Sequence, residues 1–166
     1  MQSKETKWTP MKALGKAQKE IDSLGIPEFK IDLEEKEELK FPEISQHENK
    51  ELESFLTMYG GYKAFLEIKV ADIEATVGAW EAAFTEGYNT ALYKVTKEYE
   101  EEGKKKPTRE ELRGEILIKY PYLKEQRQEL IDLQAQLKKT QGLLNSYTTA
   151  YHTVSRVVSI RTLGQN

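Results

Sequence analysis

The stretch LKEQRQELIDLQAQLKKTQGLLNSYTTAYHTVSRVVSIR, residues 123–161, decides the fold because its apolar residues recur every seven positions. One column of the repeat contains Leu123, Leu130, Leu137, Leu144, Tyr151 and Val158. The other contains Gln126, Leu133, Thr140, Tyr147, Val154 and Arg161. Spacings that alternate between three and four residues over about five heptads are typical of a coiled-coil or bundle seam. The pattern predicts a long C-terminal helix that packs along one stripe.

A second helical pattern covers residues 47–102, where apolar side chains also step by three and four. As one rod, such a helix would be about 80 Å long, although Gly60 and Gly61 could kink or break it. Gly103 and Pro107 interrupt the pattern. Thr108 and Glu111 form a capping box that starts a further helix. Pro121 should kink or end that helix. Two long helices joined at 103–108 predict an antiparallel hairpin that completes its burial by self-association.

The first 46 residues lack the long helical pattern of the rest of the chain. Thr9 and Pro10 are suited to the start of a helix, with Trp8 stapled onto its first turn, and Gly25 and Pro27 end that helix. Residues 29–44 alternate apolar and polar side chains around an acidic stretch, which fits two short strands or an extended arm that orders on a partner.

The predicted fold class is therefore mainly α: a long antiparallel helical hairpin with a coiled-coil-like C-terminal helix and a short N-terminal arm, part helix and part extended. We expect two parts, an N-terminal helix with an extended acidic arm over 1–46 and a hairpin and oligomerisation domain over 47–166. Eight seam residues are predicted to carry self-association: Leu130, Leu133, Leu137, Leu144, Tyr147, Tyr151, Val154 and Val158.

The net charge of −3 conceals an asymmetry along the chain. Residues 1–50 carry −2 and residues 51–100 carry −5, whereas residues 101–166 carry +4, and no acid follows Asp132. An acidic average therefore does not exclude anion binding by the last third. The absence of cysteine excludes disulfides, and no apolar run approaches the roughly 18 residues that span a bilayer. We expect a soluble protein of the cytoplasm, without membrane contact.

Signals for catalysis are weak. His47 and His152 lack a spaced partner that would indicate a metal site, and they read as surface histidines. The segment GKKKPT, residues 103–108, lacks the first glycine of a P-loop and joins two helices. We expect no enzyme activity, no cofactor and no metal.

The basic residues of the last third, together with two lysines before it, are the candidates for contact with a nucleic-acid backbone. Solvated helix connections, and cations favoured by a helix C-terminus, are the simpler explanations, and both remain open. Among the tyrosines, Tyr93 lies off the apolar stripe beside two lysines and is the better candidate for stacking on bases. The predicted DNA-binding residues are Lys94, Lys97, Lys104, Lys105, Lys106, Arg109, Arg113, Arg156 and Arg161.

The segment VSRVVSIR, residues 154–161, is similar to the C-terminal pattern of the UvsY-type phage recombination mediators, with Arg156, Ile160 and Arg161 on the matching positions. The segment ALYKVTKEYEEEGKK, residues 91–105, resembles that family's basic, tyrosine-bearing helix end. Lys94 and Lys97 lie near the positions of the family's DNA-contacting residues, and the order of helices agrees over roughly residues 39–162.

This resemblance implies an oligomeric phage protein that binds single-stranded DNA and helps to load a RecA-like recombinase, with that recombinase and single-strand-binding protein as partners. We expect this function in recombination or replication. The alternative is a non-enzymatic oligomeric scaffold, an assembly chaperone or a host-directed anti-defence protein, which would act through protein–protein contacts.

Overall fold

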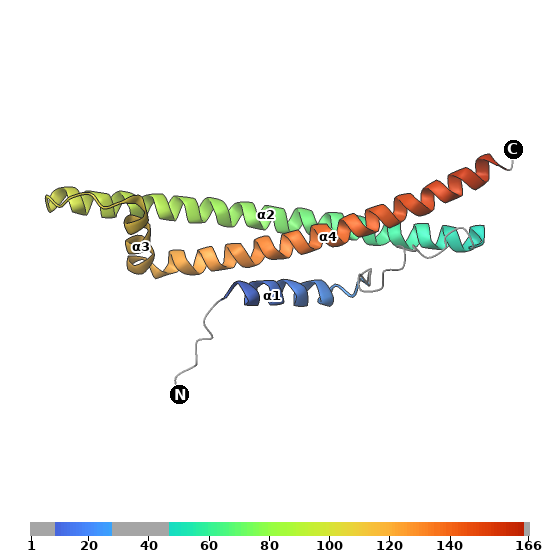
Figure 1. Cartoon of the computed structure of the whole chain (residues 1–166), viewed down its shortest axis with the longest axis horizontal. Helices are drawn as coiled ribbons and strands as arrows, with labels where there is room; N and C mark the ends of the chain where they lie inside the picture. The colour runs from blue at the N-terminus through green and yellow to red at the C-terminus, as the bar shows by residue number, and fades with distance from the viewer. Residues whose placement is uncertain (1–8, 28–46, 165–166) are drawn as a thin grey trace, which may run out of the picture. The chain divides into compact units, whose positions relative to one another are not determined.

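The computed structural model describes residues 9–27 and 47–164 of the chain, and these form four helices (Figure 1). They are α1 (Pro10–Ser23), α2 (Asn49–Glu101), α3 (Arg109–Lys119) and α4 (Pro121–Leu163). No strand occurs within these two ranges, and the prediction of a mainly α helical hairpin is confirmed. The predicted strands or extended arm over 29–44 and the Trp8 staple lie outside the described residues.

The helix ends follow the capping chemistry of the sequence. The Lys12 backbone N–H donates to the Thr9 hydroxyl at 3.3 Å, at the start of α1. At α3, the Glu111 N–H donates to the Thr108 hydroxyl and the Thr108 N–H donates to the Glu111 carboxylate, which completes the predicted capping box. Pro121 ends α3 and does not merely kink it, because proline lacks an N–H and disfavours helical geometry at the residue before it. The same proline then occupies the first position of α4.

The predicted joint at 103–108 differs from a simple hairpin turn. It connects α2 to the short helix α3, and α3 then leads through Tyr120 into α4. The turn after α2 is made by Gly103, whose φ of 64° lies in the left-handed region, and the Lys104 N–H donates to the Tyr99 carbonyl. The two long helices of the hairpin are therefore joined through a third.

Residue contacts divide the chain into two units, to which α1, α2 and α4 each contribute a segment. Unit 1 comprises Met1–Gln18 and Asp72–Gln136, and unit 2 comprises Lys19–Ala71 and Leu137–Asn166. Helix α2 continues through Gly60 and Gly61 without a break. This pair of glycines is tolerated because tertiary packing, more than intrinsic propensity, stabilises helices in folded proteins.

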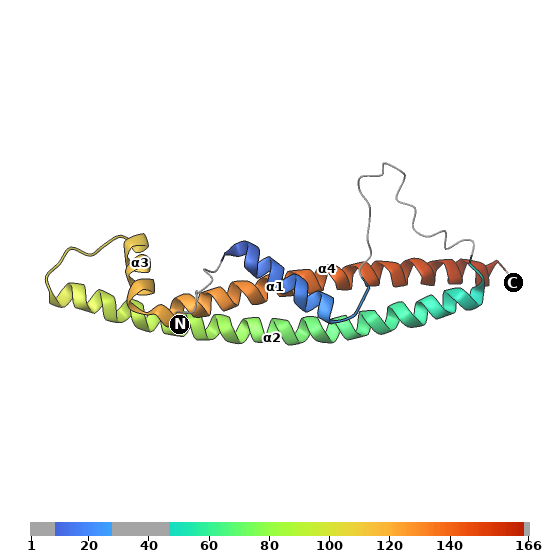
Figure 2. The ribbon, with the colours of Figure 1, turned by 90° about the horizontal axis from the view of Figure 1, so that it is seen from below.

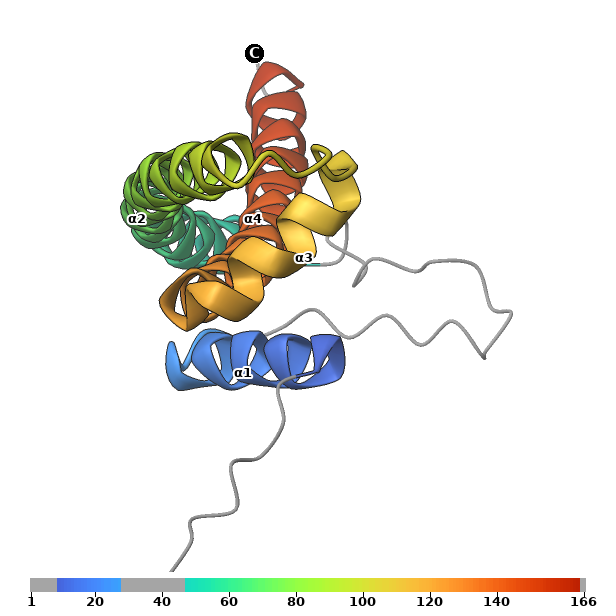
Figure 3. The ribbon, with the colours of Figure 1, turned by 90° about the vertical axis from the view of Figure 1, so that its left-hand side faces the viewer.

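In unit 1, α3 lies across the region where α2 ends and α4 begins (Figures 1 and 3). The core here combines all three helices, with Ala91, Val95, Leu112, Ile116 and Leu123 buried together. Gly87 allows α4 to approach α2 closely, since a methyl group at this position would lie 3.0 Å from a Leu123 methyl carbon. The first part of α1 adds buried Ala13 and Ala17 to this unit.

An ion-pair contact joins α1 to α4 in unit 1. The Lys16 ammonium lies 3.3 Å from carboxylate oxygens of both Glu129 and Asp132. Partial burial lowers the pKa of Lys16, but the two carboxylates outweigh it and the pKa is raised overall. Exposed pairs of this kind contribute little free energy, so the alanine face of α1 does most of the packing.

In unit 2, the core gathers residues from the end of α1, from α2 and from α4. Ile21, Ile26, Leu66, Leu143 and Tyr147 are buried together. The Tyr147 hydroxyl donates to the Pro27 carbonyl, and the Tyr147 ring contacts the rings of Tyr59 and Tyr62 at centroid distances of 5.9 and 5.1 Å. This buried tyrosine therefore holds the chain just after α1 onto the hairpin, and in Figure 2 the end of α1 lies beside α2 and α4.

The buried stripe of α4 in unit 2 is centred slightly off the predicted one. The second predicted column is buried at Thr140, Tyr147 and Val154, but Leu143 and Ala150 are more deeply buried than Leu144 and Tyr151 of the first column. The reason is that α4 packs against the end of α1 as well as α2, so its buried face is wider than a two-helix seam.

Replacing Leu66 with alanine should destabilise unit 2 by about 2–5 kcal/mol, because a fully buried leucine would leave a cavity. Ile68→Ala is the matched control: Ile68 lies on the same turn of α2 and is 63% exposed, so a change within about 0.5 kcal/mol is expected. Urea unfolding followed by circular dichroism measures both. Equal losses would contradict the packing of α2.

The stability of the protein should fall between pH 10 and 12 in a way that depends on Tyr147. Burial, with smaller effects of Tyr62 and Tyr59, raises the pKa of Tyr147 from 10.0 to about 12. Below pH 10 the tyrosine is neutral in both folded and unfolded chains. Above pH 10 the unfolded chain ionises first, so the contribution to stability is lost as pH rises towards 12.

Unfolding by urea at several pH values tests this, with Tyr147→Phe as the comparison. The phenylalanine variant should be less stable near pH 8, because it lacks the bond to Pro27, and its stability should fall less between pH 10 and 12. Parallel pH profiles for the two proteins would show that Tyr147 is not responsible.

Candidate nucleic-acid interface

Seven of the nine predicted DNA-binding residues lie in unit 1, and all seven are exposed. We call this set the basic end: Lys94 and Lys97 near the end of α2, Lys104, Lys105 and Lys106 in the joint, and Arg109 and Arg113 on α3. The structure places the other two, Arg156 and Arg161, on α4 in unit 2. The candidate interface therefore has its principal part in unit 1.

Net charge alone does not mark the basic end, because residues 94–119 hold eight basic and seven acidic side chains. The basic side chains differ from one another in whether they form ion pairs with these acids. Lys97 pairs with Glu101 at 3.5 Å, Lys104 with Glu102 at 2.6 Å, and Lys119 pairs with Glu98. The hydrogen bond between Lys104 and Glu102 raises the pKa of the lysine and lowers that of the glutamate.

Five cations of the basic end remain without an ion-pair or hydrogen-bond partner among residues 9–27 and 47–164. These are Lys94, Lys105, Lys106, Arg109 and Arg113. Each is solvent-exposed and keeps its charge free to attract an external anion.

Helix α3 separates its charges onto two sides. Glu111, Glu115 and Lys119 are spaced by four residues on one side, which is turned towards α2: the Tyr99 hydroxyl donates to Glu115 at 2.8 Å, which raises the pKa of Tyr99. Arg109 and Arg113 are also four apart, on a different side of the helix. The capping hydrogen bonds from Thr108 hold the pKa of Glu111 below its usual value. Two of the three glutamates of α3, Glu111 and Glu115, are thus engaged within the fold.

In unit 2, Arg161 makes hydrogen bonds that stabilise the fold. One guanidinium nitrogen donates to the His47 carbonyl at 2.6 Å and to the Asn49 side-chain oxygen at 3.1 Å, at the start of α2. His47 in turn contacts Glu51 at 3.1 Å. Arg156 is exposed and has no partner within the described chain. The two arginines of the C-terminal motif therefore differ: Arg161 ties two helix ends together, and Arg156 faces solvent.

The predicted oligomerisation residues also fall into two groups, one buried within the chain and one partly exposed. Tyr147 and Val154 are buried within the chain and are not offered on its surface. The other six are partly exposed: Leu130, Leu133, Leu137, Leu144, Tyr151 and Val158.

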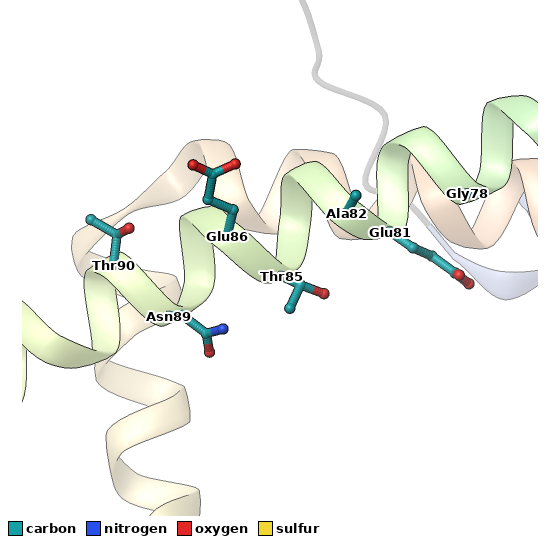
Figure 4. A pocket seen from close by; sticks show the side chains of 7 residues that line it. All are labelled: Gly78, Glu81, Ala82, Thr85, Glu86, Asn89 and Thr90. Atoms are coloured by element: carbon teal, nitrogen blue, oxygen red, sulfur yellow. The ribbon is translucent and has the colours of Figure 1, made fainter.

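Several exposed apolar residues were not predicted from the sequence pattern. Met58, Phe65 and Ile68 form one face of α2 in unit 2, and they lie off the three-and-four stripe that marks the buried face. In unit 1, a shallow hollow on the exposed face of α2 is lined mostly by small and uncharged side chains (Figure 4): Gly78, Glu81, Ala82, Thr85, Glu86, Asn89 and Thr90. Small residues produce no periodic apolar signal, so only the structure reveals this hollow.

The described chain offers no arrangement for metal chemistry: across residues 9–27 and 47–164, no group of three or more histidine, cysteine, aspartate or glutamate side chains could hold an ion. In the same ranges, no helix is both long enough and apolar enough to cross a membrane.

Replacing Arg161 with alanine should cost about 1–2 kcal/mol of unfolding free energy, because the His47 carbonyl and the Asn49 side chain lose a charged donor. Arg156→Ala is the matched control, an exposed arginine on the same helix, with an expected change within about 0.5 kcal/mol. Chemical denaturation measures both, and similar values would contradict the structural role of Arg161.

Comparisons with protein-family models, with curated proteins and with solved structures each found no match to this chain. Inference about its function therefore starts from its own residues and their geometry.

Proposed function

We propose that this protein binds single-stranded DNA through the basic end and acts as a non-enzymatic accessory of phage recombination or replication. The observation that supports this most directly is the group of five exposed cations in unit 1 that have no partner among residues 9–27 and 47–164. Phosphate contacts by lysine and arginine supply most of the affinity of proteins for nucleic-acid backbones without sequence preference.

The arrangement of these cations suits one strand of a flexible backbone. Arg109 and Arg113 lie one helical turn apart, with Cβ atoms about 5–6 Å from each other, so they can contact neighbouring phosphates. Lys105 and Lys106 precede them in the joint, outside any helix, where their side chains can follow the strand. Arginine can also bind a phosphate with two parallel hydrogen bonds.

The remaining parts of the proposal rest on the resemblance to the UvsY-type mediators. They are the loading of a RecA-like recombinase, contact with single-strand-binding protein, and action as an oligomer. The six partly exposed apolar residues of α4 described above are the candidates for contacts between copies.

Titration of labelled single-stranded DNA at several salt concentrations tests the proposal. Neutralising Lys105, Lys106, Arg109 and Arg113 together with alanine should weaken binding at low salt. It should also reduce the slope of log affinity against log salt by about 3, since each lost contact with a single strand contributes about 0.7.

The matched control removes the same charge elsewhere, through alanine at Lys19, Lys50, Lys124 and Lys138, four exposed lysines outside the basic end. Its salt slope should stay close to that of the original protein. Equal losses in the two variants would show that only the total charge matters, and no binding at low salt would contradict the proposal. Light scattering on the same samples tests the oligomer, which a monomeric mass would exclude.

A further inference from the structure

Tyr93 stands apart from the other eight tyrosines of the chain. Its side chain is 68% exposed, and within the described residues it has neither a ring contact nor a hydrogen-bond partner. The others each have one: Tyr59 and Tyr62 both contact Tyr147, Tyr88 stacks on Phe84, Tyr99 donates to Glu115, Tyr120 contacts Tyr122, and Tyr151 contacts His152. Tyr93 is therefore the most exposed of the nine tyrosines and the one ring without a contact among residues 9–27 and 47–164.

Cations border this ring on the side towards the basic end. Lys94 follows it directly, and Lys97 lies one turn further along α2 on the same face. Lys94 has no partner in the described part of the chain, and Lys97 has only the long contact of 3.5 Å to exposed Glu101. An anion beside the Tyr93 ring would meet positive charge within one helical turn.

The shallow hollow of α2 lies on the N-terminal side of Tyr93. Asn89 and Thr90 lie one turn before Tyr93, and behind them come the small side chains of Thr85 and Ala82 (Figure 4). No aromatic or large apolar side chain lines the hollow, so it leaves room for a flat group beside this part of α2. Glu86, two turns before Tyr93, would repel a phosphate placed over the hollow and favour one placed near Lys94 and Lys97.

We infer that Tyr93 is a stacking platform for an unpaired nucleobase, with the adjoining phosphates held by Lys94 and Lys97. This inference rests on the proposed binding of single-stranded DNA and adds to it the reason for a single strand. In a duplex each base is already stacked between its neighbours, whereas an unpaired base has a free face for an aromatic side chain. The basic end alone would not distinguish the two forms.

The test compares two labelled oligonucleotides of equal length and charge, about 16 nucleotides long, one of thymidine and one with abasic sites. The full-length protein should bind the thymidine strand about tenfold more tightly, because only that strand has bases to stack. Tyr93→Ala should reduce this preference to less than about twofold while leaving the salt slope unchanged, since no charge is removed. Tyr93→Phe keeps the ring and should keep the preference.

Ile118→Ala is the control for the loss of an exposed apolar side chain in the same unit, since Ile118 is 82% exposed on α3. It should leave the preference for the thymidine strand intact. Since the readout is a ratio of two affinities for one protein sample, a loss of folded protein would not imitate the effect.

The outcomes separate the two hypotheses. If Tyr93→Ala retains the preference of the original protein while binding remains steeply salt-dependent, the stacking role is wrong and phosphate binding by the basic end stands. The same holds if the original protein binds both strands equally. If neither strand binds at low salt, the proposed function fails and the stacking role fails with it.

Discussion

The close packing of α4 along α2 is the interaction on which the rest of the structure depends. Helices of 53 and 43 residues cannot be stabilised by local propensity alone, and each needs an apolar stripe covered by a neighbour. Gly60 and Gly87 let the two helices approach, with Tyr151 and Leu123 lying over them. Helices α1 and α3 then add to this seam, one in each core: Ile21 joins Leu143 in unit 2, and Ile116 joins Leu123 in unit 1.

This packing also determines which charged side chains near the joint between α2 and α3 are paired. On α2 and α3 near the joint, most carboxylates are engaged by lysines, by Tyr99 or by a helix cap, and these bonds fix the orientation of α3. Arg109 and Arg113 lie on a different side of α3 from Glu111 and Glu115. A segment with nearly balanced charge can thus present several free cations, which is why an acidic average does not exclude a phosphate-binding surface.

The C-terminal arginines show how one sequence motif can contain two different roles. The spacing of Arg156 and Arg161 around Ile160 is the basis of the resemblance to recombination mediators, yet the two side chains have different surroundings. Arg161 is engaged with the start of α2, whereas Arg156 is solvent-exposed. Of the two side chains, Arg156 is therefore the more accessible to an external anion.

The sequence by itself determined the helical class, the main helix boundaries and the apolar stripes, because heptad spacing, proline and the Thr108 capping box act locally. It also identified the cations of the basic end and the unusual place of Tyr93. Only the tertiary structure decided that α4 buries Leu143 and Ala150 and that Arg161 is bound at His47. These outcomes depend on contacts between residues far apart in the sequence, 114 positions in the case of Arg161 and His47, and no local pattern specifies which side chain will meet which. Residue type and spacing tell which groups could bind a phosphate; packing decides which of them remain free to do so.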